Sequence, residues 1–516
     1  MFSLILVMGC AIAAGWVANR VLVPYPIVMV LTGVALGFAY DWPTLDIDPT
    51  LVLAIVLPAV LYPAALDTSW REARQNLRPI VLLATGLVAT TTLAVGIAFK
   101  WLVPETPWPV ALALGAIVSP PDAVAASAVI RRLRLPRWLV TVLEGESLVN
   151  DATGLVLYRF AIVAVLTGQF SAGAMVGQFV VIAAGGLAIG IAAGLLTTYL
   201  QERLRDPMLE LAVSLTTPFA TYLVCESVDV SGVLGIVAVG LYRARWSHGR
   251  SSPEARVNIR MVWRAVVFVV NCLVFVLMGI RLPELAPSLL VHQSYSWSEL
   301  TILVFALTGV AIATRFAWVF VATYGVRLLV PSIRRRDPAS ARVSTVVSWS
   351  GMRGVVSLAA ALALPTTLPD GQPFPQHDLV ILLAFGIVFV TLVGQGLTLP
   401  ALIRSLRLEI DESGDRESAM ARDAMRRAAI DAINRLVAEH GIPAYEAVGV
   451  RRFFTSRAQP QSSALAPDAE ARLWLCAASA QREVLLKLWR DGEIGEDVLV
   501  QLEREIDLAE LRLVSQ

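Results

Sequence analysis

Long apolar segments separated by short polar loops make up most of this chain. A transmembrane helix needs about 20 predominantly apolar residues. By that criterion the pattern predicts an all-α polytopic membrane protein with about thirteen transmembrane helices. We expect these helices near residues 2–18, 26–40, 50–66, 79–102, 108–130, 138–166, 172–200, 208–226, 231–245, 261–281, 298–327, 342–364 and 378–403.

The loops between these segments alternate in charge. Arginine clusters occupy every second loop, and the loops between them are poor in basic residues. Cytoplasmic loops of membrane proteins are enriched in Lys and Arg, so the alternation places the N-terminus outside and the C-terminus in the cytoplasm. The clusters are Arg20, Arg71 to Arg78, Arg131 to Arg137, Arg203 to Arg205, Arg243 to Arg256, and Arg334 to Arg336.

The composition agrees with a multi-pass protein of the cell (inner) membrane, whose main surroundings are lipid. Of the 516 residues, 56% are hydrophobic and only 16% are charged, whereas soluble domains carry about 25% charged residues. The net charge of +1 gives no indication of a nucleic-acid partner. The four cysteines, Cys10, Cys225, Cys272 and Cys476, show no metal-binding or disulfide pattern, and no cofactor is expected.

The composition changes near residue 404. Residues 404–516 are rich in Arg, Glu and Asp, and Met420 to Glu439 and Asp468 to Trp489 show helical spacing of apolar residues. We therefore expect a transmembrane domain over residues 1–403 and a soluble, cytoplasmic helical tail over 404–516. The tail is interpreted either as a solubilising and oligomer-supporting element or as a regulatory one that binds a regulator.

Two of the expected helices contain sequences that interrupt a helix. The fifth expected helix (residues 108–130, span 5) contains Ser119-Pro120-Pro121-Asp122, where two prolines remove backbone hydrogen-bond donors. The twelfth expected helix (residues 342–364, span 12) contains Ser350-Gly351-Met352-Arg353-Gly354, which is a second weak point in a helix. Because the two segments lie seven spans apart, they run in opposite directions, which is typical of inverted repeats whose broken helices cross at a midplane site.

Three charged residues on three spans lie at a similar depth. Measured from the cytoplasmic ends at about 1.5 Å per residue, Asp122, Arg353 and Asp151 lie roughly 14, 16 and 20 Å into the membrane. The hydrocarbon core is about 30 Å thick, so all three are expected near its middle. Ionisable residues in such a place indicate an ion or proton pathway.

Span 6 carries the densest polar motif, Glu144-Gly145-Glu146-Ser147-Leu148-Val149-Asn150-Asp151. Residues three and four apart share a helix face, so Ser147 and Asp151 point the same way, with Glu144 on the pathway nearer the cytoplasm. Glu146 lies about 140° away from Asp151 at about 100° per residue. We therefore expect Glu146 to form a structural ion pair with Arg353, because an unpaired buried charge is very unfavourable.

Oxygen atoms suited to an alkali cation gather at the predicted site. Asp151, Asp122 and the Ser147 hydroxyl supply hard ligands for Na⁺, and the interruption at Pro121 frees backbone carbonyls. Burial favours the protonated form of a carboxylate, so a proton and a cation (Na⁺, or else Li⁺ or K⁺) compete for Asp151.

Asn150 adds an amide beside Asp151 without a second charge, which favours electroneutral one-for-one exchange. A hydrogen bond between helices is the alternative role for Asn150.

These motifs resemble the monovalent cation:proton antiporter family, in its electroneutral sodium/proton exchanger branch of bacterial type. The matching stretches are Gly115 to Ala125, Glu144 to Leu155, Trp349 to Ala359, Asn271 to Gly279 and Trp489 to Leu508. The resemblance implies a role in pH homeostasis and a homodimer with a dimerisation domain and a mobile core that moves in an elevator-type shift. It also implies that Asp151 and Asp122 bind the ion, that Ser147 assists, that Asn150 marks the electroneutral branch and that Glu146 pairs with Arg353.

Two positions depart from the family pattern. Pro121 stands where relatives often carry Thr, which leaves only its carbonyl as a ligand. Pro63 stands where relatives often carry a Glu that would partner Asn150. Both replacements bear on proton coupling and on the choice between Na⁺ and K⁺.

Two other function classes fit part of the pattern. Asp122 and Asp151 at one depth are compatible with an intramembrane aspartyl hydrolase, although the Ser147 and Asn150 oxygens and the broken helix favour ion binding. A passive monovalent cation channel is the main alternative to an antiporter. Buried titratable ligands favour alternating occupancy over rapid passage, so a secondary transporter rather than an enzyme or channel is predicted.

Overall fold

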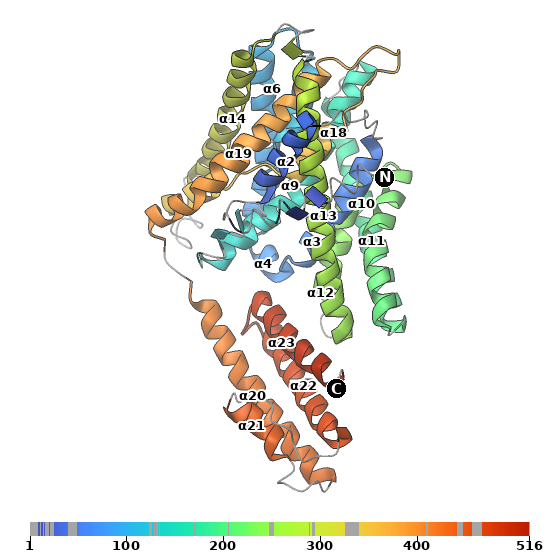
Figure 1. Cartoon of the computed structure of the whole chain (residues 1–516), viewed down its shortest axis with the longest axis vertical. Coiled ribbons are helices and arrows are strands. Elements are labelled where there is room, and N and C mark those ends of the chain that lie inside the picture. Colours follow the sequence, from blue (N-terminus) through green and yellow to red (C-terminus); the bar gives the residue numbers. More distant parts are fainter. Residues whose placement is uncertain are drawn as a thin grey trace. The chain divides into compact units, whose positions relative to one another are not determined.

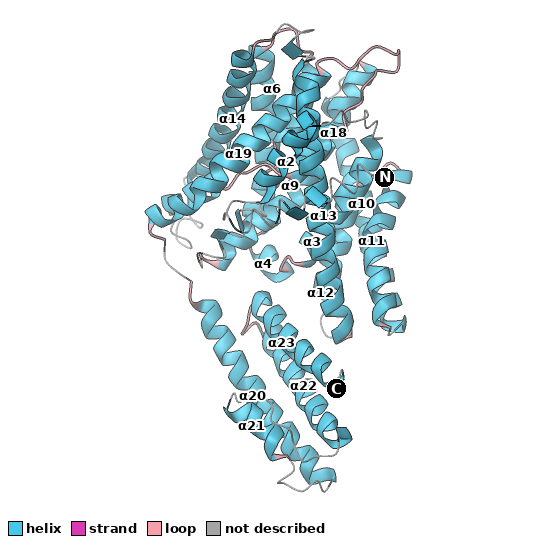
Figure 2. Ribbon diagram, in the orientation of Figure 1, coloured by secondary structure: helices cyan, strands magenta, loops and turns pink. Residues whose placement is uncertain are grey.

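The computed structural model describes residues 25–39, 49–122, 126–127, 129–130, 133, 135–168, 172–204, 206–246, 252–287, 289–290, 295–325, 340–408, 411–440, 447–456 and 467–514, and a few positions before residue 21. Helices dominate the described part, and an isolated β-bridge joins Thr367 to Pro373 (Figure 1; Figure 2). The all-α prediction is therefore confirmed.

The helices before the tail fall into two sets, those up to and including the helix that carries the polar motif and those that follow it. The first set is α2 (Tyr25–Ala39), α3 (Pro49–Leu66), α4 (Trp70–Gln75), α5 (Leu77–Val81), η1 (a π-helix, Leu82–Leu87), α6 (Val88–Leu102), α7 (Trp108–Val118) and α9 (Arg137–Thr167). The second is α10 (Ala172–Leu204), α11 (Pro207–Ser227), α12 (Gly232–Trp246), α13 (Pro253–Pro287), α14 (Trp297–Phe320), η3 (a π-helix, Val321–Gly325), α17 (Ala341–Trp349), α18 (Val355–Leu362) and α19 (His377–Leu406). The tail contains α20 (Ser413–His440), α21 (Val448–Ser456), α22 (Pro467–Asp491) and α23 (Glu496–Val514).

The described residues include seven helical segments long and apolar enough to cross a membrane. Three shorter apolar helices, Tyr25–Ala39, Leu51–Leu66 and Trp108–Val118, add to them. The multi-pass class is thus confirmed, while the count of thirteen spans stays a prediction. The seven segments are Leu77–Leu102, Arg137–Thr167, Val180–Leu204, Pro207–Ser227, Pro253–Pro283, Trp297–Gly325 and His377–Leu406.

Both predicted helix interruptions are present. α7 ends at Val118, directly before Ser119-Pro120-Pro121, because the prolines cannot donate the next helical hydrogen bonds. α17 ends at Trp349, and residues 350–354 form a non-helical connection to α18. The two interruptions contact each other, since the Asp122 N–H donates to the Met352 carbonyl at 2.6 Å.

The helices around these interruptions form one group, which we call the site bundle: α6, α7, α9, α14, α17, α18 and α19. α7 packs between α6 and α9, while α14 contacts α6, α17 and α19. In this bundle α9 and α19 each exceed the thickness of the hydrocarbon core, so both can carry a residue at mid-depth. The bundle therefore holds the two interruptions and the polar motif of α9 together.

A second group, the scaffold group of α2, α3 and α10 to α13, packs through small residues. Gly186, Gly190 and Gly194 repeat every four residues on α10, and a Cβ at any of them would overlap the segment that begins at Val230 and continues through α12. Gly33 of α2 and Gly279 of α13 meet backbone to backbone in the same way. Such contacts let membrane helices approach closely.

α3 and α11 are among the helices that join the site bundle to the scaffold group. α3 packs against α9 and α18, and Ala65, Leu148 and Val237 form a small buried apolar cluster between the groups. Arg159 of α9 donates to both carboxylate oxygens of Glu226 at the end of α11, at 2.6 and 2.7 Å.

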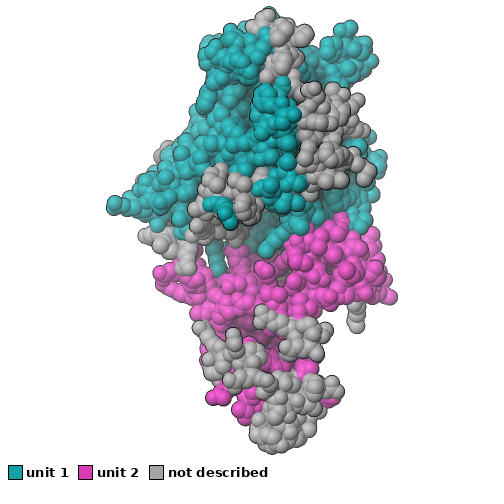
Figure 3. Space-filling model, viewed as in Figure 1, with its two compact units in different colours: residues 1–195, 216–243, 263–410 teal, residues 196–215, 244–262, 411–516 magenta. Residues whose placement is uncertain are grey.

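The chain divides into two compact units (Figure 3). Unit 1 comprises residues 1–195, 216–243 and 263–410, and it contains the site bundle and most of the scaffold group. Unit 2 comprises residues 196–215, 244–262 and 411–516, which are the tail together with adjoining ends of α10 to α13. Within unit 2, α20, α22 and α23 bury a shared core that includes Met425, Leu485 and Leu502.

The glycine contact between α10 and α12 gives a direct stability test. In Gly190→Ala the new methyl group would overlap the Gly235 carbonyl oxygen, and such overpacking costs about 1–3 kcal/mol. We expect a lower melting temperature of the detergent-purified protein. The matched control is Gly177→Ala on the same helix, where nothing lies within 4 Å. Equal melting temperatures for both variants would show that the contact contributes nothing.

Candidate functional site

α9 carries the polar motif through the centre of the site bundle. This helix is continuous over 31 residues and ends where Gly168 adopts a left-handed conformation. Asn150 is fully buried, Asp151 is 7% exposed and Glu146 is 1% exposed. Ser147 and Glu144 are half-buried, so the polar residues of one helix lie at graded depths inside the protein.

Asp122 lies at the point where the two interruptions meet. Its N–H is held by the Met352 carbonyl, and its carboxylate lies directly against Gly354. A Cβ at Gly354 would overlap the carboxylate oxygen Oδ2 of Asp122. The second interruption thus leaves room for the Asp122 carboxylate only because residue 354 has no side chain.

Asn150 joins α9 to the first interruption. Its amide nitrogen Nδ2 donates to the Pro121 carbonyl at 2.9 Å. Its amide oxygen Oδ1 is buried and has no hydrogen-bond partner among the described residues. The residue therefore forms the hydrogen bond between helices that was one of its two expected roles, and it keeps an oxygen acceptor available beside Asp151.

Asp151 follows Asn150, whose amide donates to the carbonyl of Pro121, the residue before Asp122. The described part of the structure gives Asp151 no ion pair with a basic side chain. Two carboxylates that share a site without a cation between them repel each other when both are ionised. A bound proton or cation relieves that repulsion, and this is the chemistry that the arrangement can perform.

The predicted ion pair between Glu146 and Arg353 is wrong. The carboxylate forms a bidentate pair with Arg315 of α14, with Nη1–Oε1 and Nη2–Oε2 distances of 2.5 and 2.9 Å, and not with Arg353. Arg315 Nε also donates to the Val347 carbonyl of α17 at 3.1 Å. Both charged side chains are almost fully buried, so this pair fixes α9, α14 and α17 relative to one another.

Arg353 binds backbone carbonyls instead of the Glu146 carboxylate that was predicted as its partner. Its Nε donates to the Val118 carbonyl at 2.7 Å, and Nη1 donates to the Gly351 carbonyl. Val118 is the last residue of α7, and a cation near a helix C-terminus satisfies free carbonyls and interacts favourably with the helix dipole. The guanidinium stays within electrostatic range of Glu146 and Arg315 without a direct contact to Glu146.

Three residues of this region were not assigned to the site from the sequence, although Arg315 was expected to pair with a neighbouring helix. Arg315 is a charged residue inside an otherwise apolar helix, which was a usable signal. Thr391 of α19 accepts the Arg353 N–H at 3.2 Å, and Gln395, one turn further along, is buried without a hydrogen-bond partner among the described residues. Thr391 and Gln395 gave no signal, since single polar residues in membrane helices are common between helices.

Interrupted helices that cross beside buried carboxylates define a class of secondary transporters. The sodium/hydrogen exchanger (transmembrane) family matches residues 5–405 of this chain. The chain belongs to that family of cation/proton antiporters, and it is a transporter rather than an enzyme.

Individual relatives agree with this assignment. The Na⁺/H⁺ exchanger Rv2287 of Mycobacterium tuberculosis is 34% identical over 530 residues, which cover 99% of this chain and 96% of the relative. The sodium, potassium, lithium and rubidium/H⁺ antiporter of Bacillus pumilus is 32% identical, covering 83% of this chain and 65% of that protein.

A solved structure shares the fold. The sodium proton antiporter MjNhaP1 of Methanocaldococcus jannaschii matches with a TM-score of 0.62 at 17% identity, covering 78% of this chain and 97% of that one.

The buried pair of Glu146 and Arg315 predicts strong coupling between the two residues. Glu146→Gln and Arg315→Met each leave one buried charge without its partner, which costs about 3–5 kcal/mol of unfolding free energy. The double variant removes both charges, so we expect it to lose clearly less than the sum of the single losses. Thermal unfolding in detergent measures this cycle, and additive losses would contradict the pairing.

The fit between Gly354 and Asp122 predicts a specific transport defect. Gly354→Ala displaces the Asp122 carboxylate, so we expect a loss of exchange activity of at least about tenfold, equivalent to about 1.4 kcal/mol. Gly309→Ala is the matched control, because nothing lies within 4 Å of that position. Proton flux in liposomes and thermal unfolding are measured together; full activity in folded Gly354→Ala would contradict the described packing.

Proposed function

We propose that the protein exchanges one monovalent cation for one proton by alternating access, with Asp151 as the competing ligand. The observation that carries the proposal is the hydrogen bond from Asn150 Nδ2 to the Pro121 carbonyl at 2.9 Å, which joins the residue before Asp151 to the residue before Asp122 where the two interruptions meet. Asp151, Asp122 and the Ser147 hydroxyl bind the cation, while Asn150 Oδ1 and the Pro121 carbonyl lie beside them. Glu144 belongs to the pathway on the cytoplasmic side.

The coupling follows from charge. An empty site with ionised carboxylates is unfavourable in a low-dielectric interior, so it crosses between its inward- and outward-facing states only when a proton or a cation is bound. A proton and a cation each neutralise the same carboxylate, and they exclude each other. Cation movement in one direction is therefore tied to proton movement in the other.

Na⁺ is the proposed principal cation, with Li⁺ or K⁺ as alternatives. The hard oxygen ligands suit all three ions, and the Bacillus pumilus relative is named for sodium, potassium, lithium and rubidium. Asn150 stands beside Asp151 and adds no second carboxylate there. This supports an electroneutral stoichiometry of one cation for one proton.

We further infer a homodimer in the cell (inner) membrane, with the N-terminus outside and the tail from about residue 404 in the cytoplasm. The alternation of arginine-rich loops supports that orientation. Exposed apolar side chains on the scaffold helices, among them Leu187, Ile191 and Leu195 of α10, supply surface for lipid or for a second copy.

The experiment follows internal pH in liposomes that contain the purified protein while Na⁺, Li⁺ or K⁺ is added outside. We expect cation-driven proton movement without net current, and we expect Asp151→Asn to abolish it because the amide cannot titrate. The control is Asp229→Asn, since Asp229 is exposed and outside the site.

Two results would contradict the proposal. Full exchange by Asp151→Asn would reject the site assignment. Cation current that is indifferent to a pH gradient would favour the passive channel instead of the antiporter.

A further inference from the structure

Gln395 of α19 is a buried amide that has no role in the proposed exchange at Asp151. Its side chain is 2% exposed, and neither Oε1 nor Nε2 has a hydrogen-bond partner among the described residues. Burying an amide without hydrogen bonds costs about 1–3 kcal/mol. A buried polar group without a protein partner calls for an explanation, and a bound ion is one of the few that apply.

Contacts before and after Gln395 place it beside the second interruption. One turn before it, Thr391 accepts the Arg353 N–H at 3.2 Å. One turn after it, Thr398 accepts a hydrogen bond from Trp349 Nε1 at 2.9 Å. Trp349 ends α17 and Arg353 lies directly before the start of α18. Gln395 is therefore level with the non-helical connection between these two helices.

The face of α19 that carries Gln395 is turned toward this connection. Residues four apart share a helix face, and Thr391, four residues before Gln395, contacts the connection. Leu399, four residues after it, belongs to a buried apolar cluster that includes Met352. The Gln395 amide is therefore directed at the interruption whose Met352 carbonyl holds the Asp122 N–H.

Two other buried oxygen atoms lie around the same junction of the interruptions. Asn150 Oδ1 and Ser127 Oγ also have no hydrogen-bond partner within the described part of the chain. Asn150 contacts the first interruption through the Pro121 carbonyl. Ala126, the neighbour of Ser127, packs in the apolar cluster that contains Met352. Uncharged oxygen atoms with acceptor capacity thus approach the junction from three directions.

An amide suits an alkali cation with part of its hydration shell. Na⁺, Li⁺ and K⁺ are hard ions that take carboxylate, hydroxyl and amide oxygens as ligands. The amide nitrogen of a glutamine can donate to a water of that shell at the same time. Gln395 lies one turn nearer the C-terminal end of α19 than Thr391, which is the cytoplasmic side in the proposed orientation.

We propose that the Gln395 amide is a further ligand of the transported cation, on the cytoplasmic side of Asp122 and Asp151. Oε1 faces the ion, Nε2 donates to its hydration water, and the residue helps to set the apparent affinity for Na⁺. This inference rests on the proposed exchange activity, because it adds a ligand to the site that performs it.

The test replaces Gln395 with Leu, which has a similar size and no polar atoms. We expect the apparent KM for Na⁺-driven proton movement in liposomes to rise about fivefold, which corresponds to about 1 kcal/mol. The maximal rate should change by less than about twofold, as for the loss of uniform binding. The melting temperature in detergent should not fall, because Gln395 has no hydrogen bond to lose among the described residues.

Two comparison variants separate a ligand from a packing residue. Gln395→Glu keeps an oxygen at the same place, so its KM should not exceed that of the unaltered protein. Gln201→Leu is the matched control, because Gln201 of α10 is equally buried but donates to the Glu210 carbonyl at 3.1 Å. It should lower the melting temperature and leave the KM unchanged. Gln395→Met replaces Gln395→Leu if the branched side chain reduces the amount of folded protein.

Binding is measured separately from transport. An ion that binds the folded protein raises its melting temperature in a concentration-dependent way. We expect the Na⁺ concentration that gives half of this rise to increase about fivefold in Gln395→Leu, in line with the change in KM. Gln201→Leu should show the same half-maximal concentration as the unaltered protein.

The outcomes separate the two proposals. An unchanged KM and an unchanged Na⁺ titration in Gln395→Leu would overturn the ligand role, with or without a lower melting temperature. Equal increases of the KM in Gln395→Leu and Gln395→Glu would overturn it as well, because the oxygen would then contribute nothing. Absence of proton movement in the unaltered protein would overturn the proposed function, while the Na⁺ titration would still decide the role of Gln395.

Discussion

The two interrupted helices depend on each other for their hydrogen bonds. Inside a membrane, backbone groups released by an interruption have no water to bind, so they need partners in the protein. The Asp122 N–H finds the Met352 carbonyl, and the Val118 carbonyl finds the Arg353 guanidinium. Each interruption thus satisfies groups freed by the other, and Asp122 is held at their junction as a consequence.

Three buried charged residues, Arg353, Arg315 and Glu146, hold the neighbouring helices around this junction. Arg353 carries its positive charge to the end of α7, Arg315 binds Glu146, and Glu146 is within electrostatic range of both guanidinium groups. Such an arrangement contributes little net free energy as an isolated pair, since desolvation offsets attraction. The charges fix the orientation of α9, so that Asn150 faces the interruption.

Much of this arrangement could be predicted from the sequence. The adjacent prolines and the glycines at 351 and 354 indicated where the helices break. The common depth of Asp122, Asp151 and Arg353 stays a prediction. The helical angle also showed that Glu146 faces away from Asp151. The angle could not decide between Arg353 and Arg315 as its partner, because that choice depends on how α14 packs against α9, which no local pattern encodes.

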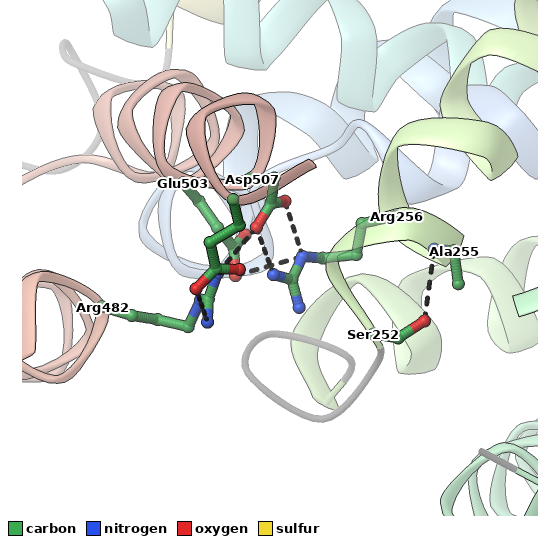
Figure 4. A network of polar contacts seen from close by, with 7 residues as sticks. Ser252, Ala255, Arg256, Arg482, Glu503 and Asp507 are labelled. Atoms are coloured by element: carbon green, nitrogen blue, oxygen red, sulfur yellow. Dashed lines mark hydrogen bonds and ion pairs between the residues drawn. The ribbon is translucent and has the colours of Figure 1, made fainter. Parts of the chain in front are cut away.

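The tertiary contacts of the tail could not be predicted from the sequence either. The pattern of α23 predicts a helix, but a ladder of acids at Glu503, Asp507 and Glu510 reads as an ordinary solvated face. The approach of Arg482 from α22 and of Arg256, about 250 residues earlier in the chain, turns that face into a buried surface (Figure 4). Sequence spacing carries no record of such distant partners, whereas it records the local breaks well.

The ion pair of Arg159 and Glu226 differs from that of Glu146 and Arg315 in its exposure. Arg159 and Glu226 remain partly in contact with solvent, at 41% and 31% exposure, and exposed ion pairs contribute only about 0–1 kcal/mol. The sealed pair of Glu146 and Arg315 and the glycine contacts of α10 and α12 lie within the two helix groups. The exposed pair of Arg159 and Glu226 therefore contributes less to holding α9 in place than the sealed pair of Glu146 and Arg315 does.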